Sequence, residues 1–278
     1  MSVKHINLKV QKNKFMEPIL NVKNLTMNFG GLKALDSIDL AVEKGQIAAL
    51  IGPNGAGKTT FFNCITGIYE PSEGNVKITP PGKPTQSLQG LKTNVVTERG
   101  LARTFQNIRL FEGMTVLENV MIGRHCRLKS GIISAMLRSS NQKNEEKEAI
   151  DDSYEILEKI GLNQYVNEMA VNLPYGAQRR LEIARALATD PFLLLLDEPA
   201  AGMNPQETKE LDDLIIWLRD NEDLSILLIE HDMKLVMSLS DNIHVVDYGR
   251  KIAEGTPEEI KSNPDVIKAY LGDESEDA

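Results

Sequence analysis

The stretch "QIAALIGPNGAGKTT", residues 46–60, joins an apolar run to a loop rich in glycine. Within it, the segment "GPNGAGKT" matches the pattern GxxxxGK[ST] of a phosphate-binding loop. Glycines allow backbone N–H groups to curl around phosphates, Lys58 would reach the β and γ oxygens, and Thr59 would offer a hydroxyl to Mg²⁺. The alternative is a plain glycine-rich turn. The residues predicted to bind a nucleotide here are Gly52, Pro53, Asn54, Gly55, Ala56, Gly57, Lys58, Thr59 and Thr60.

Three apolar runs predict the fold class. The pattern of "QIAALIG" recurs in "FLLLLDE" (192–198) and "SILLIEHD" (225–232). Short runs that are apolar throughout are typical of parallel strands covered on both faces. The near-alternation of "ILNVKNLTMNF" (19–29) and "IDLAV" (38–42) indicates half-buried strands instead. We therefore expect an α/β fold with its ligand site at the carboxyl ends of the parallel strands.

Polar residues close two of these runs. At the end of the second run, Asp197 would hold Mg²⁺ through water, and Glu198 would orient or deprotonate an attacking water. Two carboxylates that merely cap the turn before Pro199 are the alternative. His231 follows the third run, so we expect its ring at the same sheet edge as Lys58, in contact with a γ-phosphate. A purely structural histidine remains the other interpretation.

Composition limits the class of protein. The 278 residues are 41% hydrophobic, which is enough for a sizeable core. The 31 Lys and Arg against 40 Asp and Glu give a net charge of −9, which opposes binding to nucleic acid. Cys64 and Cys126 form no metal or disulfide pattern and are interpreted as packing residues. We predict no secretory signal and no apolar run of the roughly 18 residues that a membrane span needs.

A helical region is expected between the first and second runs. The segment "EEKEAIDDSYEILEKIG", residues 145–161, places Ile150, Tyr154, Leu157 and Ile160 on one helix face and ends at Gly161. The same segment pairs Glu155 with Lys159 one turn later. Near the end of the chain, "VVDYGRKIAEG" (245–255) is similar to a hairpin.

Six motifs occur in a fixed order: "GPNGAGKTT", "ARTFQN", "PYGAQRRLEIARAL", "LLLLDEP", "AAGMNP" and "EHD". In order and spacing they resemble the nucleotide-binding subunit of an ABC transporter, from about Ile19 to Ile260. The resemblance implies that Gln106 senses Mg²⁺ and a membrane partner, and that Phe29 stacks on adenine. For Gln106 the alternative is an ordinary polar surface residue, and for Phe29 it is a plain core aromatic.

The resemblance also implies a domain organisation. The expected core is a P-loop NTPase of the ABC type, with a mainly parallel sheet, an antiparallel β subdomain and a helical subdomain insert. The boundaries are an N-terminal extension at 1–17, an ABC ATPase domain at 18–260 with its helical subdomain at about 113–172, and a C-terminal tail at 261–278.

The stretch "LPYGAQRRLEIARAL", residues 173–187, is a loop that turns into a helix, and a helix N-terminus suits an anion. In ABC transporters two ATPase domains pack head to tail. The resemblance therefore implies that Tyr175, Gly176 and Ala177 cover a γ-phosphate bound by a second subunit. The loop departs from the family's usual LSGGQ, because Pro174 stands in place of serine, so we expect a weaker grip.

The Pro-Tyr-Gly signature together with "DEPAAGMNP" is similar to the ATP-binding subunits of high-affinity branched-chain amino acid importers. The likeness implies ATP and Mg²⁺ as cofactors and a peripheral position on the cytoplasmic face of the inner membrane. Implied partners are a second ATP-binding subunit, identical or different, integral-membrane permease subunits and an extracytoplasmic binding protein. The alternatives are the ATPase of a lipid or lipopolysaccharide exporter and a soluble ABC ATPase acting on nucleic acid.

Residues 119–144 contain five Lys or Arg and no acid. This basic stretch surrounds an apolar set, Ile132, Ile133, Met136 and Leu137. Two interpretations stay open: a surface that docks a membrane subunit or anionic lipid, and a solvated helical hairpin.

Overall fold

The computed structural model describes residues 17–127 and 140–273. The strands are β1 Leu20–Phe29, β2 Leu32–Val42, β3 Ile47–Ile51, β4 Glu73–Ile78, β5 Gln86–Ser87, β6 Leu101–Arg103, β7 Leu193–Asp197, β8 Ser225–Ile229, β9 Asn242–Asp247 and β10 Arg250–Gly255. The α-helices are α1 Lys58–Ile65, α2 Thr93–Glu98, α3 Val116–Arg124, α5 Ser140–Lys159, α6 Tyr175–Leu187, α7 Pro205–Asn221, α8 Met233–Leu239, α9 Pro257–Lys261 and α10 Pro264–Asp273. Short 3-10 helices are η1 His125–Arg127, η2 Asn163–Tyr165 and η3 Ala170–Asn172.

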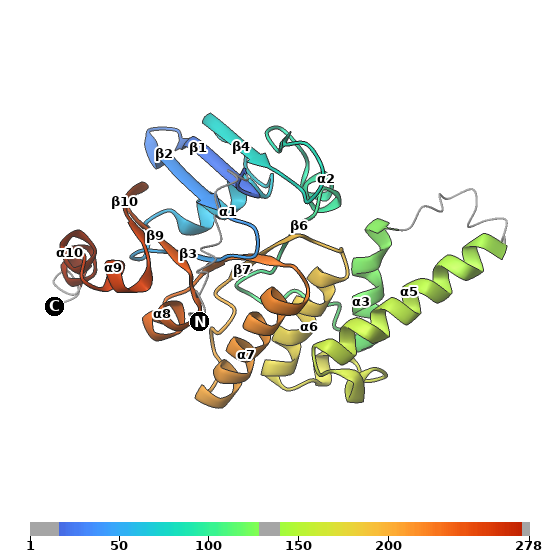
Figure 1. Ribbon diagram of the computed structural model, residues 1–278. Helices are drawn as coiled ribbons and strands as arrows, with labels where there is room; N and C mark the ends of the chain where they lie inside the picture. The colour runs from blue at the N-terminus through green and yellow to red at the C-terminus, as the bar shows by residue number, and fades with distance from the viewer. Residues whose placement is uncertain (1–16, 128–139, 274–278) are drawn as a thin grey trace, which may run out of the picture.

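Two sheets of different kind form the body of the protein (Figure 1). The smaller sheet has the order β2-β1-β4-β5 and is antiparallel. The larger sheet has the order β10-β9-β3-β8-β7-β6, in which β9, β3, β8, β7 and β6 run parallel and β10 pairs antiparallel at the edge. The predicted α/β class, with a separate antiparallel sheet, is confirmed.

The three apolar runs are the central parallel strands β3, β8 and β7, and every residue in them is buried. Alternate residues of β7 enter different cores. Leu193 and Leu195 pack with Phe61 and Phe62 of α1 and with the antiparallel sheet, whereas Leu194 and Leu196 pack with α6 and α7. Helix α1 therefore lies between the two sheets, and the loop before it is held at the carboxyl edge of β3.

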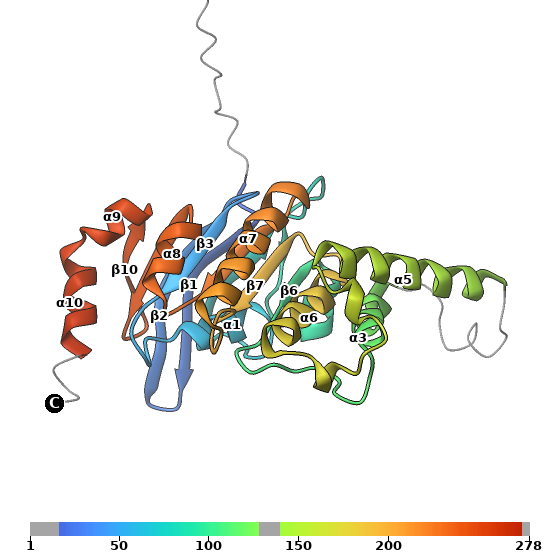
Figure 2. The same ribbon diagram turned by 90° about the horizontal axis from the view of Figure 1, so that it is seen from below.

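The helical region packs around α3, α5 and α6, at the end of the molecule away from α10 (Figures 1 and 2). The predicted ion pair of Glu155 with Lys159 is present at 3.0 Å, and the helix is followed by Gly161 with a φ of +72°. The predicted buried face is wrong at Tyr154, which is 44% exposed. Leu157 and Ile160 are buried as predicted, and the core also receives Ala149 and Ser153, which lie eight and four residues before Leu157.

Two charges of the basic stretch make internal contacts. Arg124 pairs with Asp152 of α5. The guanidinium of Arg127 donates to the backbone carbonyls of Thr189, Glu98 and Asp190. Replacing either arginine by glutamate would therefore disturb the fold as well as any docking. Lys129 and the apolar set Ile132, Ile133, Met136 and Leu137 lie outside the described residues.

The C-terminal region continues the main domain. The predicted hairpin is confirmed as β9 and β10, which pair with Asp247 opposite Arg250. Val266 of α10 is 5% exposed and belongs to the larger core, although its segment was assigned to a tail from the sequence. Cys64 is buried as expected, but Cys126 is exposed and is no packing residue. In residues 17–127 and 140–273, no helix has the length and apolar character needed to cross a bilayer.

Candidate active site

The glycine-rich loop follows β3 and leads into α1 at Lys58. A Cβ atom on Gly52, where φ is +155°, would lie 2.0 Å from the carbonyl oxygen of Val246. On Gly57, where φ is +104°, it would lie 2.8 Å from that of Ala34. Only glycine fits either position. The N–H of Gly249 also donates to the Ala56 carbonyl at 3.0 Å, so strands β2 and β9 and the hairpin turn support the loop from behind.

Lys58 is buried within the curve of this loop. Its Nζ atom donates to the carbonyl oxygens of Gly52 at 2.6 Å and Pro53 at 2.8 Å. The tip of the loop, Asn54 and Gly55, is exposed. The other predicted members lie as follows: Ala56 is buried, and Thr59 and Thr60 stand in the first turn of α1. The loop thus presents its tip and the helix start to solvent, while the lysine stays inside.

Three side chains meet where β7 and β8 end: Glu198, Gln106 and His231. This follows from the sheet order, because the parallel neighbours β3, β8 and β7 have their carboxyl ends at the same edge. The Nε2 atom of His231 lies 2.5 Å from Oε1 of Glu198. The side-chain amide of Gln106 donates to Oε2 at 2.7 Å. Glu198 itself has a φ of +49°, a left-handed conformation of the kind that clusters at functional sites. Gln106, although exposed, is therefore more than an ordinary surface residue.

Asp197 has a partner that the sequence did not reveal. The Nη2 atom of Arg103, on β6, lies 2.7 Å from Oδ2 of Asp197. The same guanidinium donates to Oδ1 of Asn63 at 2.7 Å and lies 5.4 Å from the ring centroid of Phe62 and 5.2 Å from that of Phe105. The one available signal was an arginine three residues before Gln106 in "ARTFQN".

Glu230 was also missed, although it directly precedes His231. Its carboxylate accepts hydrogen bonds from the backbone N–H groups of Ala200 at 2.9 Å and His231 at 3.1 Å. Burial raises the pKa of Glu230 above its ordinary value, although these bonds oppose the shift. Glu230 thereby joins the turn after Glu198 to the segment that carries the histidine.

The signature stretch begins α6, with Pro174 as the residue before the helix. The N–H of Ala177 donates to the Pro174 carbonyl at 2.9 Å, so it is already used within the helix. Tyr175 and Gly176 stand one step earlier, where a helix has no carbonyl of a preceding turn to receive its N–H groups. These two backbone groups are the better candidates for an anion.

Phe29, at the end of β1, is 43% exposed, so the core-aromatic alternative is wrong. Its ring stands edge-on to Tyr69, with centroids 5.3 Å apart.

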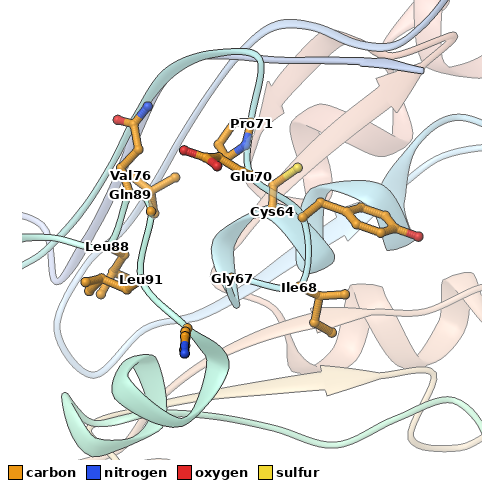
Figure 3. Close-up of a pocket in the computed structure, with 12 residues that line it drawn as sticks. Cys64, Gly67, Ile68, Glu70, Pro71, Val76, Leu88, Gln89 and Leu91 are labelled. Atoms are coloured by element: carbon orange, nitrogen blue, oxygen red, sulfur yellow. The ribbon is translucent and has the colours of Figure 1, made fainter. Parts of the chain in front are cut away.

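A pocket of about 230 Å³ near Tyr69 lies beyond the carboxyl end of α1, away from the phosphate loop (Figure 3). In Figure 3, Cys64 and Ile68 face Leu88 and Leu91 across it. Burial raises the pKa of the Cys64 thiol to about 11, which leaves it protonated at neutral pH.

Comparison with known families identifies the fold. The sequence profile described as ABC transporter matches residues 35–201, a range that includes the phosphate loop, Gln106, the signature stretch and Glu198. The chain belongs to the ABC transporter family. Residues 250–276 of this ABC cassette also match a profile described as branched-chain amino acid ATP-binding cassette transporter. As a member of the family it binds ATP and is an ATPase of the kind coupled to transport.

Relatives cover the cassette almost end to end. The high-affinity branched-chain amino acid transport ATP-binding protein LivG of Escherichia coli K12 is 51% identical over 257 residues, which are 92% of this chain and 99% of LivG. BraF of Pseudomonas aeruginosa, named for the same transport, is 48% identical over 256 residues, covering 92% and 98% of the two chains. The crystal structure of MJ1267 in its ADP conformation, an ATP-binding cassette of an ABC transporter, matches with a TM-score of 0.78 and 30% identity, covering 92% of this chain and 100% of that one.

Proposed function

We propose that this ABC cassette hydrolyses ATP to power the uptake of branched-chain amino acids through a membrane importer. Two relatives that carry this transport in their names match over nearly their whole length, and the C-terminal profile match points the same way. The observation that carries the hydrolytic part is the carboxylate of Glu198, held on one side by Gln106 and on the other by His231.

In this arrangement Glu198 is the general base. Its carboxylate would accept a proton from the water that attacks the γ-phosphate, which is typically worth about 10² to 10⁴ in rate. The Gln106 amide and the His231 ring each bind one carboxylate oxygen, so the carboxylate is fixed in direction. Lys58 would exchange its two loop carbonyl partners for phosphate oxygens, and Phe29 would offer its exposed ring to adenine.

The residues present suit Mg²⁺, which prefers oxygen ligands. Thr59 and Asp197 would hold the ion, with Gln106 beside them, and the ion would supply positive charge to the β- and γ-phosphates. Arg103 pairs with Oδ2 of Asp197, so the carboxylate that would hold the ion is already fixed in orientation by the protein. Across 17–127 and 140–273, no cluster of three His, Cys, Asp or Glu side chains is suited to a metal on its own. Binding would therefore depend on the nucleotide's phosphates.

A second ATP-binding subunit would complete the site. The chain has one phosphate loop and one signature stretch, and the first turn of α6 offers the Tyr175 and Gly176 amides together with the helix dipole. These groups would cover the γ-phosphate held by the partner subunit. Pro174 makes no side-chain hydrogen bond to the helix start, so the grip would be weaker than with serine.

A groove of about 590 Å³ beside the Gln106 loop would receive the permease subunits. It is lined in part by Phe105, Arg109, Phe111 and Ile122, and the last two are 45% and 37% exposed. Exposed apolar side chains gathered in one place are a feature of interaction surfaces. The cassette would then sit peripherally at the cytoplasmic face of the inner membrane, with a binding protein delivering the amino acid from the far side.

Hydrolysis and uptake test the proposal together. Glu198→Gln should retain ATP binding while ATP hydrolysis by the purified protein and leucine uptake by cells are nearly abolished. Glu155→Gln, the same change at an exposed carboxylate on α5, should leave both unchanged. If ATP is hydrolysed but uptake of leucine, isoleucine and valine is independent of this protein, the importer assignment is wrong, and dependence of lipid export would favour the exporter.

The groove is tested separately. Ile122→Glu should abolish copurification with the permease subunits but leave the isolated protein's ATPase rate unchanged. Trp217→Glu, at an equally exposed position on α7, is the matched control and should copurify normally. Normal copurification of the Ile122 variant would exclude this groove as the docking surface.

A further inference from the structure

The hydroxyl of Tyr175 joins two segments that are far apart in the sequence. It donates a hydrogen bond to the Ala201 carbonyl at 2.9 Å and accepts one from Nη2 of Arg179 at 3.1 Å. The ring packs on Gly202, where an added Cβ would lie 3.2 Å from the tyrosine hydroxyl oxygen. Tyr175 stands where the usual signature of the family has a glycine, so these contacts depend on a departure from that pattern.

Arg179 continues the connection to the Gln106 loop. It is fully buried, and its guanidinium donates to the backbone carbonyls of Phe105 and Gln106, both at 2.8 Å. Glu182, one turn later, accepts from the Phe105 N–H at 3.3 Å and pairs with Arg179 at 3.3 Å. A buried guanidinium that lost these acceptors would leave unpaired polar groups, so the bonds fix the backbone of the loop.

These contacts form a closed ring of hydrogen bonds that includes Glu198. From the Gln106 carbonyl the ring runs through Arg179 and Tyr175 to the Ala201 carbonyl. The Ala201 N–H donates to the backbone carbonyl of Glu198 at 3.2 Å, and the Gln106 side chain binds the Glu198 carboxylate at 2.7 Å. A movement of the 200–204 loop would therefore reach the carboxylate by two routes, one of them through the tyrosine hydroxyl.

We propose that Tyr175 is a positioning residue for hydrolysis, which couples the 200–204 loop to Gln106 and so sets the orientation of the Glu198 carboxylate. This rests on the proposed function, in which Glu198 is the general base. The competing role is direct contact of the tyrosine hydroxyl with the partner subunit's nucleotide. The hydroxyl already donates to one group and accepts from another, which favours positioning.

Tyr175→Phe removes only the hydroxyl and is the test. Because the net contribution of a single intramolecular hydrogen bond is modest, kcat for ATP should fall by about three- to tenfold. KM and ATP affinity should stay within about twofold of the wild type. Tyr154→Phe is the matched control, since Tyr154 is also on a helix and is 44% exposed against 42% for Tyr175. A change in KM with kcat retained would overturn positioning in favour of nucleotide contact.

Two further measurements separate coupling from a local structural effect. In a Gln106→Ala background, Tyr175→Phe should lower kcat by less than about twofold, because the amide that links the loop to the Glu198 carboxylate is absent. An undiminished effect there would overturn the proposal. In the nucleotide-free protein, amide hydrogen exchange should accelerate in Tyr175→Phe both at 105–108 and at 200–203. Faster exchange in only one segment would refute the coupling, and this readout holds even if the wild type proves to have no ATPase activity.

Discussion

Arg103 and Asp197 form an ion pair inside the protein, with Nη2 of the arginine 2.7 Å from Oδ2 of the aspartate and side chains only 6% and 4% exposed. The carboxylate expected to bind Mg²⁺ is thus held in one orientation by the arginine before any nucleotide arrives. This pairing also accounts for a buried charge at the end of an otherwise apolar strand.

Arg103→Ala should lower the free energy of unfolding by about 3–5 kcal/mol, because it leaves the buried carboxylate of Asp197 without its ion-pair partner. Urea denaturation measures the loss. Arg103→Lys should lose less, since it keeps the charge. Arg109→Ala, which removes an exposed arginine stacked on the Phe105 ring at 4.4 Å, is the control. A loss below about 1 kcal/mol for Arg103→Ala would show that the ion pair contributes little.

His231→Ala should reduce kcat for ATP by about 10² while ATP affinity is retained, because the Glu198 carboxylate loses one of its two side-chain partners. Steady-state hydrolysis and equilibrium binding of a fluorescent ATP analogue separate the two effects. His125→Ala, at an exposed histidine of η1, should behave as the wild type. Loss of nucleotide affinity with an unchanged kcat would instead assign the histidine to binding.

Pro174→Ser should strengthen ATP-driven association of two cassettes by about fivefold, because it adds a hydroxyl and a backbone N–H at the anion site, and one hydrogen bond there is worth about 1 kcal/mol. Sedimentation in the Glu198→Gln background, with ATP present, measures the association. Pro264→Ser, at the start of α10, is the control. Unchanged association would mean that Gly176 and the helix dipole already suffice.

Asp212→Asn should stabilise the fold in a pH-dependent way. Burial first, and then the charges of Asp213, Asp232 and Glu230, raise the pKa of Asp212 from 3.8 to about 6. Its buried Oδ1 atom has no hydrogen-bond partner among the residues described. The ionised form therefore destabilises the native state fully above about pH 6, and this penalty disappears as pH falls below 3.8.

The gain from Asp212→Asn should accordingly be about 1 kcal/mol at pH 8, reduced from the full shift because the carboxyl is only partly buried, and nearly zero at pH 3.5. Thermal unfolding at the two pH values measures it. Asp151→Asn, at an exposed aspartate of α5, is the control. A gain that grows as pH falls would contradict the assigned direction of the pKa shift.

The sequence predicted those parts of the fold whose physics is local or periodic. Strands β3, β8 and β7 are buried on both faces, so each had to be apolar throughout, and parallel pairing then placed Glu198 near His231. Arg103 and Arg179 escaped prediction, because a buried charge has no periodic signature. Their acceptors are a carboxylate and two loop carbonyls that only the tertiary fold brings to them. The prediction for Tyr154 of α5 failed for a related reason. The small residues Ala149 and Ser153 occupy the buried side of the helix, and the pattern of large apolar residues does not reveal them.

The support of the phosphate loop by Val246 and Gly249 has a consequence during synthesis. The ribosome delivers the loop early and the β9–β10 hairpin near the end, so a nascent chain carries an unsupported loop for most of its translation. Nucleotide capture therefore has to wait until nearly the whole polypeptide has emerged, and a message cut short before β9 would yield a product without that capacity.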